Sequence, residues 1–169
     1  MSKFAIRLLT LAMLSVAVVA APVHAWAAPD NDPPPPSDSK KKKKSSESTV
    51  RSYAAFADAY RAAYATVYDR HDYVSAIQQL EALGRDDSAA VANLLGYSYR
   101  NAGNYDRAGQ AYAKALKLNP KHTGALEYQG VLFIKLGQKD KAQANLDKIK
   151  AICGNTTCEE YTDLAKALG

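Results

Sequence analysis

Residues 92–120 read ANLLGYSYRNAGNYDRAGQAYAKALKLNP, and the architecture of the 169-residue chain can be worked out from them. Small and apolar residues recur three or four positions apart on both sides of Gly103, which is the spacing of one helical face. Gly103 stands where the chain must leave the first helix and turn, a position that favours positive φ. Pro120 stops the second helix, because proline has no backbone N–H to donate. The stretch therefore predicts two α-helices joined by a short turn.

The same pattern extends in both directions along the chain. Three small residues recur 34 positions later: Gly96, Gly103 and Ala108 as Gly130, Gly137 and Ala142. A weaker copy lies upstream, where Ala76 precedes Ala108 by 32 positions. From Thr49 onward Pro120 is the only proline, and no stretch alternates apolar and polar residues as a strand would. Residues 49–169 are therefore expected to form one all-α domain.

A 34-residue period with two helices per unit resembles the tetratricopeptide repeat. The middle unit carries most of that pattern: Leu95-Gly96, Tyr99, Gly103-Asn104-Tyr105, Ala108, Tyr112, Ala115 and Pro120. The unit before it matches at Tyr60, Ala63, Val67, Asp72-Tyr73, Ala76, Leu80 and Leu83, and the unit after it at Leu126, Gly130, Phe133, Gly137, Ala142, Leu146 and Ile149. Ala92 replaces the family's usual tryptophan, and Tyr64 stands where a small residue is preferred. The resemblance implies an αα-hairpin solenoid with repeats over about residues 57–88, 89–122 and 123–156.

Small residues at Gly96, Ala108 and Gly130 are expected to let the two helices of one hairpin approach closely. Bulky residues then fill the space beside them. Packing of this kind is also expected for most of the eleven tyrosines, among them Tyr60, Tyr73, Tyr99, Tyr105 and Tyr112.

A solenoid needs an atypical helix at each end to cover its apolar flank. Residues 158–168 suit this role, because one apolar stripe runs through Tyr161, Leu164, Ala165 and Leu168. Thr157 and Glu160 have the spacing of a capping box at the start of a helix. The sequence therefore predicts a C-terminal capping helix.

The N-terminus has the features of a secretory signal peptide of bacterial type. Lys3 and Arg7 precede an uncharged apolar run from Leu8 to Ala21, and small residues follow at the spacing that signal peptidase recognises. The run is shorter than the roughly 20 residues that span a bilayer. We therefore expect residues 1–27 to be cleaved off and the mature protein to be periplasmic or secreted. An uncleaved inner-membrane anchor is the alternative.

Residues 28–48 predict a disordered linker, because its prolines and the five lysines Lys40–Lys44 cannot bury apolar surface. The lysine block has two interpretations: a solvated spacer, or a contact with an anionic membrane or envelope polymer. Residues 49–169 carry 15 Lys and Arg against 13 Asp and Glu, which is a net charge of +2. The basic character is therefore local and does not indicate binding to nucleic acid.

The two cysteines of the chain, Cys153 and Cys158, flank the start of the predicted cap helix. A redox-active pair usually has two intervening residues, whereas four intervene here. Export places both cysteines in an oxidising compartment. We therefore expect a structural disulfide that contributes on the order of 2 kcal/mol by closing a small loop. Free thiols and redox chemistry are the alternatives.

The sequence contains no recognisable catalytic or metal-binding motif. HExxH, GxSxG and glycine-rich phosphate loops are absent. His71 and His122 fall at predicted turns, where histidine usually caps a helix or is solvated. The cysteines and these histidines also lack the clustered spacing of a zinc site. We therefore expect no enzyme activity, cofactor or metal.

The family that the sequence resembles uses the first helix of each repeat to hold peptides or partner proteins in a concave groove. Counting from the matched glycines gives eight candidate contact residues: Arg61, Tyr68, Asn93, Tyr97, Arg100, Asn101, Glu127 and Lys135. The alternative is that they are ordinary solvated helix surface. The sequence thus predicts a non-catalytic protein–protein interaction scaffold. An envelope-surface tether that binds through Lys40–Lys44 is the second hypothesis.

Overall fold

The computed structural model describes residues 46–169, with side chains from residue 52 onward. Over this range the chain contains seven α-helices and no strand, which confirms the all-α prediction. The helices are α1 (Ser46–Tyr68), α2 (Tyr73–Ala82), α3 (Ala89–Asn101), α4 (Tyr105–Leu118), α5 (Thr123–Lys135), α6 (Lys139–Cys153) and α7 (Glu159–Leu168). The predicted signal peptide, most of the predicted linker and the Lys40–Lys44 block lie outside the described residues. Among the described helices, none is both long enough and apolar enough to cross a membrane.

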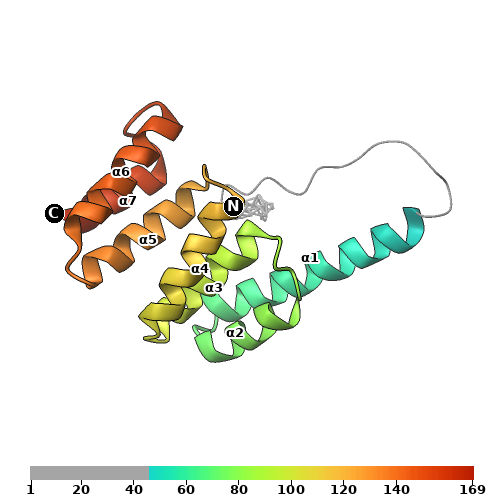
Figure 1. Ribbon diagram of the computed structural model, residues 1–169. Coiled ribbons are helices and arrows are strands. Elements are labelled where there is room, and N and C mark those ends of the chain that lie inside the picture. Colours follow the sequence, from blue (N-terminus) through green and yellow to red (C-terminus); the bar gives the residue numbers. More distant parts are fainter. Residues whose placement is uncertain (1–45) are drawn as a thin grey trace, which may run out of the picture.

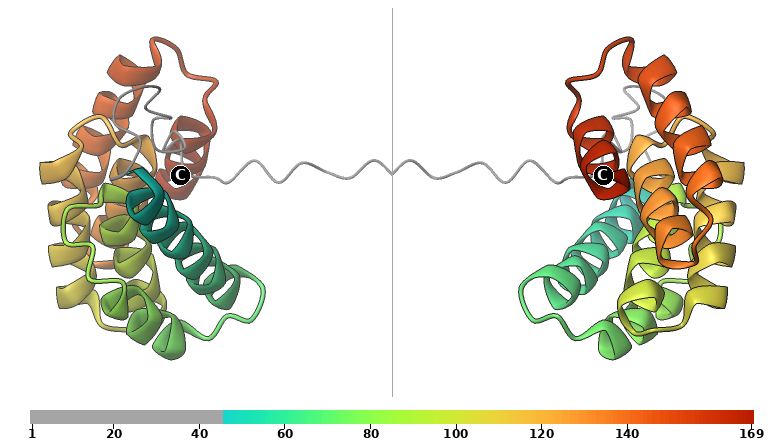
Figure 2. Two further views of the ribbon diagram at one scale, coloured as in Figure 1. Left: turned by 90° about the vertical axis from the view of Figure 1, so that its right-hand side faces the viewer. Right: turned by 90° about the vertical axis from the view of Figure 1, so that its left-hand side faces the viewer.

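The helices form pairs that stack side by side (Figure 1). α1 pairs with α2, α3 with α4 and α5 with α6, while α7 packs against both α5 and α6. Each odd-numbered helix also contacts the next odd-numbered one. Figure 2 shows the result, with α1 and α7 on one side of the stack and α4 and α6 on the other. The predicted αα-hairpin solenoid is confirmed. We call the surface formed by the odd-numbered helices the inner face.

Side chains at the helix starts satisfy backbone N–H groups that would otherwise stay unpaired. Asp72, Ser88 and Asn104 cap α2, α3 and α4 by accepting a hydrogen bond from the backbone N–H three residues further on. His122 caps α5 through Nδ1, which lies 3.1 Å from the backbone nitrogen of Ala125. The expected capping role is therefore confirmed for His122. Each such cap stabilises its helix by about 1 kcal/mol.

The turns inside two of the pairs have the backbone conformation that the glycines predicted. Gly103 and Gly137 have φ values of +82° and +72°, where other residues are strained. α4 ends at Leu118, two positions before Pro120. Both predicted turns and the predicted end of α4 are confirmed.

The predicted close approach at the repeat glycines is confirmed for Gly96. A Cβ atom there would lie 2.5 Å from ring atoms of Tyr112, on the paired helix α4. For Gly130 the contact is also tight, and its nearest neighbour belongs to the cap helix. A Cβ atom on Gly130 would lie 2.6 Å from Leu164 of α7. The glycine therefore fits the cap to the stack.

The cap helix α7 is held both by packing and by a covalent bond. Leu164 is fully buried, at 0% exposed. A disulfide joins Cys153, the last residue of α6, to Cys158, which precedes α7, with their Cα atoms 6.5 Å apart. The predicted disulfide and the predicted cap helix are therefore both present in the structure.

The predicted capping box at the start of α7 is wrong. The N-cap residue is Cys158, and no side chain caps the helix by a hydrogen bond. Glu160 is buried and instead accepts a 2.7 Å hydrogen bond from the Thr123 hydroxyl of α5. Thr157 bonds to Asn155, its neighbour in the preceding turn. A tertiary contact between α5 and α7 has therefore replaced the local one.

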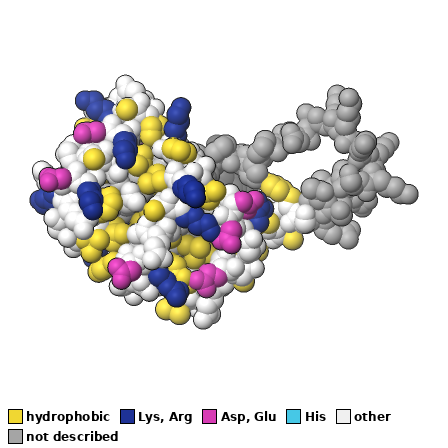
Figure 3. Space-filling model, viewed as in Figure 1, with side chains coloured by type: hydrophobic (Ala, Val, Ile, Leu, Met, Phe, Trp, Pro, Cys, Tyr) yellow, Lys and Arg dark blue, Asp and Glu magenta, His cyan; other side chains and the backbone are white. Residues whose placement is uncertain are grey.

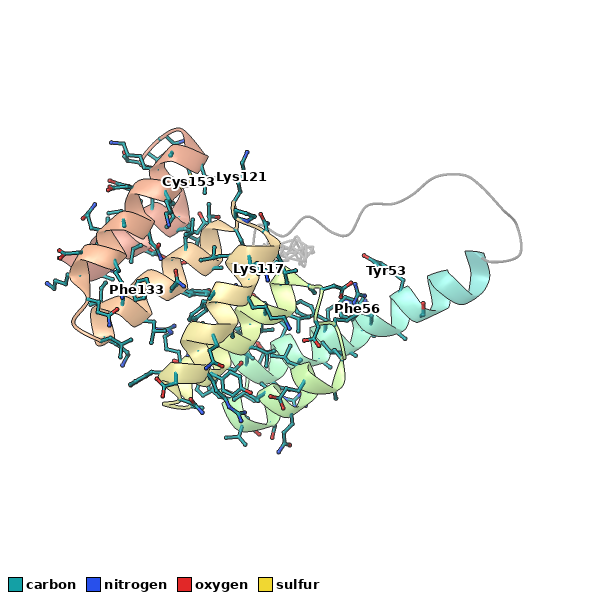
Figure 4. The ribbon with its side chains drawn as sticks, viewed as in Figure 1. Tyr53, Phe56, Lys117, Lys121, Phe133 and Cys153 are labelled. Carbon is teal, nitrogen blue, oxygen red and sulfur yellow. A yellow bond between two sulfur atoms is a disulfide. The ribbon has the colours of Figure 1, made fainter. Side chains whose placement is uncertain are left out.

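The first pair is uneven, because α1 has 23 residues and α2 has 10. α1 begins at Ser46, inside the predicted linker and well before the expected start of the first repeat at residue 57. Tyr53 and Phe56 lie along this extension (Figure 4). They line a cavity of about 570 Å³ together with Leu83 and Arg85, and the Arg85 guanidinium lies 4.5 Å from the centre of the Phe56 ring.

Candidate functional site

Four tyrosine rings form a continuous column across the inner face, which we call the tyrosine column: Tyr64, Tyr68, Tyr97 and Tyr128. Tyr64 and Tyr68 come from α1, Tyr97 from α3 and Tyr128 from α5. Successive ring centres are 4.4 Å, 5.2 Å and 5.1 Å apart, within the range of favourable aromatic pairs. The Tyr68 and Tyr128 hydroxyl oxygens are 3.5 Å apart. All four side chains are half-buried, so the column links three repeats and still reaches solvent.

Arg100 lies beside this column. Its guanidinium carbon is 5.2 Å from the centre of the Tyr97 ring and 5.8 Å from that of Tyr128, which is cation–π range. The buried Nε atom of Arg100 has no hydrogen-bond partner among the described residues. Burial raises the pKa of the Tyr112 hydroxyl, and the positive charge of Arg100 opposes that shift. Arg100 is therefore a cation already held by aromatic rings.

Glu127 of α5 lies where the inner face meets the cap helix. Burial, together with the nearby carboxylates of Asp163 and Glu160 on α7, raises the pKa of its carboxyl to about 8. Arg100 acts in the opposite direction but does not compensate. Because that pKa lies above neutrality, most Glu127 side chains carry a proton at pH 7. α7 thus contributes negative charge to the inner face as well as covering the end of the stack.

Four of the eight predicted contact residues come together in this region. Tyr68 and Tyr97 are members of the tyrosine column, Arg100 lies beside Tyr97, and Glu127 is next to Tyr128 in the chain. Asn93 was predicted to be exposed on this face, but its side chain is completely buried, at 0% exposed. Counting along a helix gives the direction of a side chain but not how deeply the neighbouring helices cover it.

The remaining three candidates lie at the edge of the column or apart from it. Arg61 forms a 2.8 Å ion pair with Asp58, one turn earlier on α1. The Asn101 side-chain amide donates to the backbone oxygen of Tyr97, at 2.9 Å, and so borders the column. Lys135 ends α5 with its Nζ atom 5.8 Å from the centre of the Tyr105 ring. All three are exposed, and neither the ion pair of Arg61 nor the ring contact of Lys135 involves a member of the column.

Sequence reasoning missed Tyr64, Tyr128 and Asp163. In the sequence Tyr64 is only a bulky residue where a small one is preferred, and the structure uses it to begin the column. Tyr128 directly follows the predicted contact residue Glu127. If α7 is treated as the first helix of a further repeat, and not only as a cap helix, the sequence places Asp163 on the inner face.

Three further features of the described region differ from this site. On the face shown in Figure 3, Lys and Arg side chains are interspersed with acidic and hydrophobic ones. A cavity of about 320 Å³ between α2, α3 and α4 is bordered by the ion pair of Lys114 and Asp86. Cys153, Cys158 and Glu160 are close enough to share a metal ion, but the disulfide removes both thiolates as ligands.

Two segments of the chain match family models described as tetratricopeptide repeat, namely residues 89–122 and 125–155. No curated protein sequence matches the chain. Among solved structures, the chain is similar to the Yersinia enterocolitica type III secretion translocator chaperone SycD. The TM-score is 0.63 and the identity 17%, and the match covers 76% of this chain and 98% of SycD.

Two further similar structures contain bound peptides. SycD in complex with a peptide of the translocator YopD has a TM-score of 0.57 at 17% identity, over 75% of this chain and 91% of SycD. The second domain of this repeat type in human RPAP3, in complex with the HSP70 peptide SGPTIEEVD, has a TM-score of 0.58 at 15% identity, over 69% of this chain and 98% of that domain. At these identities the similarity shows the fold alone.

Proposed function

Because this chain is a tetratricopeptide repeat protein, we propose that it is a non-catalytic adaptor that holds a peptide segment of a partner protein on its inner face. The observation that carries the proposal is the tyrosine column, with Arg100 beside it. Tyrosine and arginine are enriched where proteins bind one another, because they offer large contact area and a polar end. Three repeats contribute to the column, so a ligand bound there would contact the whole stack.

The column is also prepared for binding before a ligand arrives. Its rings contact one another, and Arg100 is held between Tyr97 and Tyr128. Side chains that are already ordered lose little conformational entropy on binding, which leaves more of the contact energy as affinity. The peptide complexes of SycD and of the RPAP3 domain support the proposal, since both proteins have this fold and hold a peptide.

We further propose that the protein works in the periplasm or outside the cell. The N-terminal charges, apolar run and small residues favour export, and the Cys153–Cys158 disulfide is suited to an oxidising compartment. N-terminal sequencing of the protein recovered from the cell envelope is expected to begin at Ala28. An N-terminus that still carries the apolar run would support the membrane-anchor alternative.

Site-specific crosslinking tests the adaptor proposal. A photoreactive phenylalanine analogue at position 97 is expected to capture a defined peptide segment, which mass spectrometry of the crosslinked product identifies. The same analogue at Lys117, an exposed position of α4, is the matched control (Figure 4). A synthetic copy of the captured segment should bind the purified chain, and Tyr97→Ala should weaken this binding at least about tenfold. Identical products from both positions, or unchanged affinity in Tyr97→Ala, would refute the proposal.

A further inference from the structure

We propose that the segment bound on the inner face presents a lysine or arginine side chain, whose cation binds between Glu127 of α5 and Asp163 of α7. This inference rests on the proposed function and specifies the chemistry of its partner. Two independent features support it: an excess of carboxylates where α5 meets α7, and aromatic rings that lead up to that point.

The first feature is a local imbalance of charge. α5 and α7 are in contact at Thr123–Glu160 and at Gly130–Leu164, and Glu127 and Asp163 lie between these two contacts along their helices. Five ionisable groups influence this corner of the inner face: Glu127 on α5, Glu159, Glu160 and Asp163 on α7, and Arg100 on α3. Four of the five are acidic. Glu160 is buried and its carboxylate accepts the Thr123 hydroxyl, so it is fixed in place. Glu127 and Asp163 carry no ion pair or hydrogen bond among those described, which leaves their carboxylates available to an incoming cation.

The one cation of this corner is already committed elsewhere. The Arg100 guanidinium lies over the rings of Tyr97 and Tyr128. A second positive charge, supplied by the partner, would therefore reduce the carboxylate repulsion that Arg100 leaves uncompensated.

The second feature is the position of the tyrosine column. Tyr128 is adjacent to Glu127 in the chain, and Tyr97 is in ring contact with Tyr128. Lysine and arginine have long apolar stems that pack along aromatic surface while the charged end reaches a carboxylate. Aromatic faces also attract cations directly. The column and the carboxylates together therefore fit a basic side chain better than an acidic or purely apolar one.

Binding of such a side chain should be coupled to the loss of a proton. Most Glu127 carboxyls are protonated at pH 7, because the pKa is raised to about 8. A cation bound beside Glu127 favours its ionised form, so binding releases protons to the buffer. An acidic or neutral ligand at the same place would release none.

Selection from a peptide library tests the proposal and requires no partner protein. Random dodecapeptides displayed on phage are selected on the purified full chain, with the Cys153–Cys158 disulfide intact. We expect the selected peptides to share one position enriched in Lys or Arg. Affinity of a selected peptide, measured by calorimetry, should fall about tenfold or more in Glu127→Gln and in Asp163→Asn, as for a lost charge-assisted hydrogen bond. Asp147→Asn on the exposed surface of α6 is the matched control and should leave affinity unchanged.

Calorimetry in two buffers gives an independent measurement. The protons that binding releases are taken up by the buffer. Between phosphate and Tris at pH 7, the apparent binding enthalpy of the unmodified chain should therefore differ by the number of released protons times the difference between the ionisation enthalpies of the two buffers. In Glu127→Gln this difference should disappear. Asp163 is exposed, so Asp163→Asn should fold normally and keeps the test valid if Glu127→Gln is unstable.

The outcomes separate the two proposals. Two results overturn the basic-residue inference alone. In the first, the selected peptides lose affinity in Tyr97→Ala but share no basic position. In the second, they bind Asp163→Asn as tightly as the original chain. A failure to select any peptide that depends on Tyr97 overturns the proposed function itself.

Discussion

Gly96→Ala adds a single methyl group where α3 packs against Tyr112 of α4, and its effect on stability can be worked out from the structure. The new Cβ atom would lie 2.5 Å from two ring carbons of Tyr112. Ordinary carbon–carbon contact needs about 3.5–4.0 Å, so the ring must move by about 1 Å. Tyr112 is completely buried, so the ring can move only against neighbouring core residues and not into solvent.

Two effects of opposite sign decide the result. Alanine is favoured over glycine inside a helix by about 1 kcal/mol. Overpacking of a full core costs about 1–3 kcal/mol, and a rigid aromatic ring at 2.5 Å belongs at the upper end of that range. We therefore expect Gly96→Ala to lower the free energy of unfolding by about 1–2 kcal/mol.

Gly109→Ala provides the matched control within the same repeat. Gly109 also lies inside a helix, but a Cβ atom there would lie 3.8 Å from Leu132, which is ordinary contact. The gain in helix propensity is then uncompensated, and Gly109→Ala should stabilise the chain by up to about 1 kcal/mol.

Urea denaturation followed by circular dichroism, with the disulfide intact, measures both variants. Combining Gly96→Ala with Tyr112→Leu removes the ring, so the cost of the added methyl should shrink in a double-mutant cycle. If Gly96→Ala and Gly109→Ala stabilise the chain equally, the close packing of α3 against Tyr112 is not as described.

Three further predictions concern the cap, the acidic corner and the lysine block. Replacing Cys153 and Cys158 with serine should lower the free energy of unfolding by about 2 kcal/mol, which is the chain-entropy value for a loop that joins residues five positions apart. Hydrogen exchange should then rise first in α7. Unchanged exchange in α7 would contradict the role of the disulfide in holding this helix. Burial raises the pKa of Glu127 above its unfolded value, so the folded chain binds more protons than the unfolded one between about pH 4.5 and 8. The free energy of unfolding should therefore fall as pH rises through this window. In denaturation measurements between pH 5 and 8, Glu127→Gln should flatten this fall. Replacing Lys40–Lys44 with serine should remove any salt-sensitive binding to anionic vesicles and leave peptide selection by the inner face unchanged. Vesicle binding that survives either this replacement or high salt contradicts the tether hypothesis.

Counting positions along a helix predicts the direction of a side chain but not its burial. Tyr97 and Arg100 are correctly placed on the inner face because they are three positions apart on one helix, and that spacing fixes their relative direction. Asn93 follows the same count and is nevertheless buried, because its exposure depends on how closely the neighbouring helices pack. Glu160 shows the same limit: its local spacing indicates a capping box, but Thr123 of α5 takes its carboxylate.

By itself the sequence determined the solenoid, its hairpin turns and its disulfide. These features depend on short-range causes: helical periodicity, the backbone freedom of Gly103 and Gly137, and two cysteines only five positions apart. Only the tertiary structure decided that rings from three repeats join into one column and that α7 brings its carboxylates to Glu127. The physical reason is that ring contacts and the pKa of a carboxyl depend on distances between separate helices. Those distances are set by side-chain packing across the stack, and periodicity along one helix does not contain them.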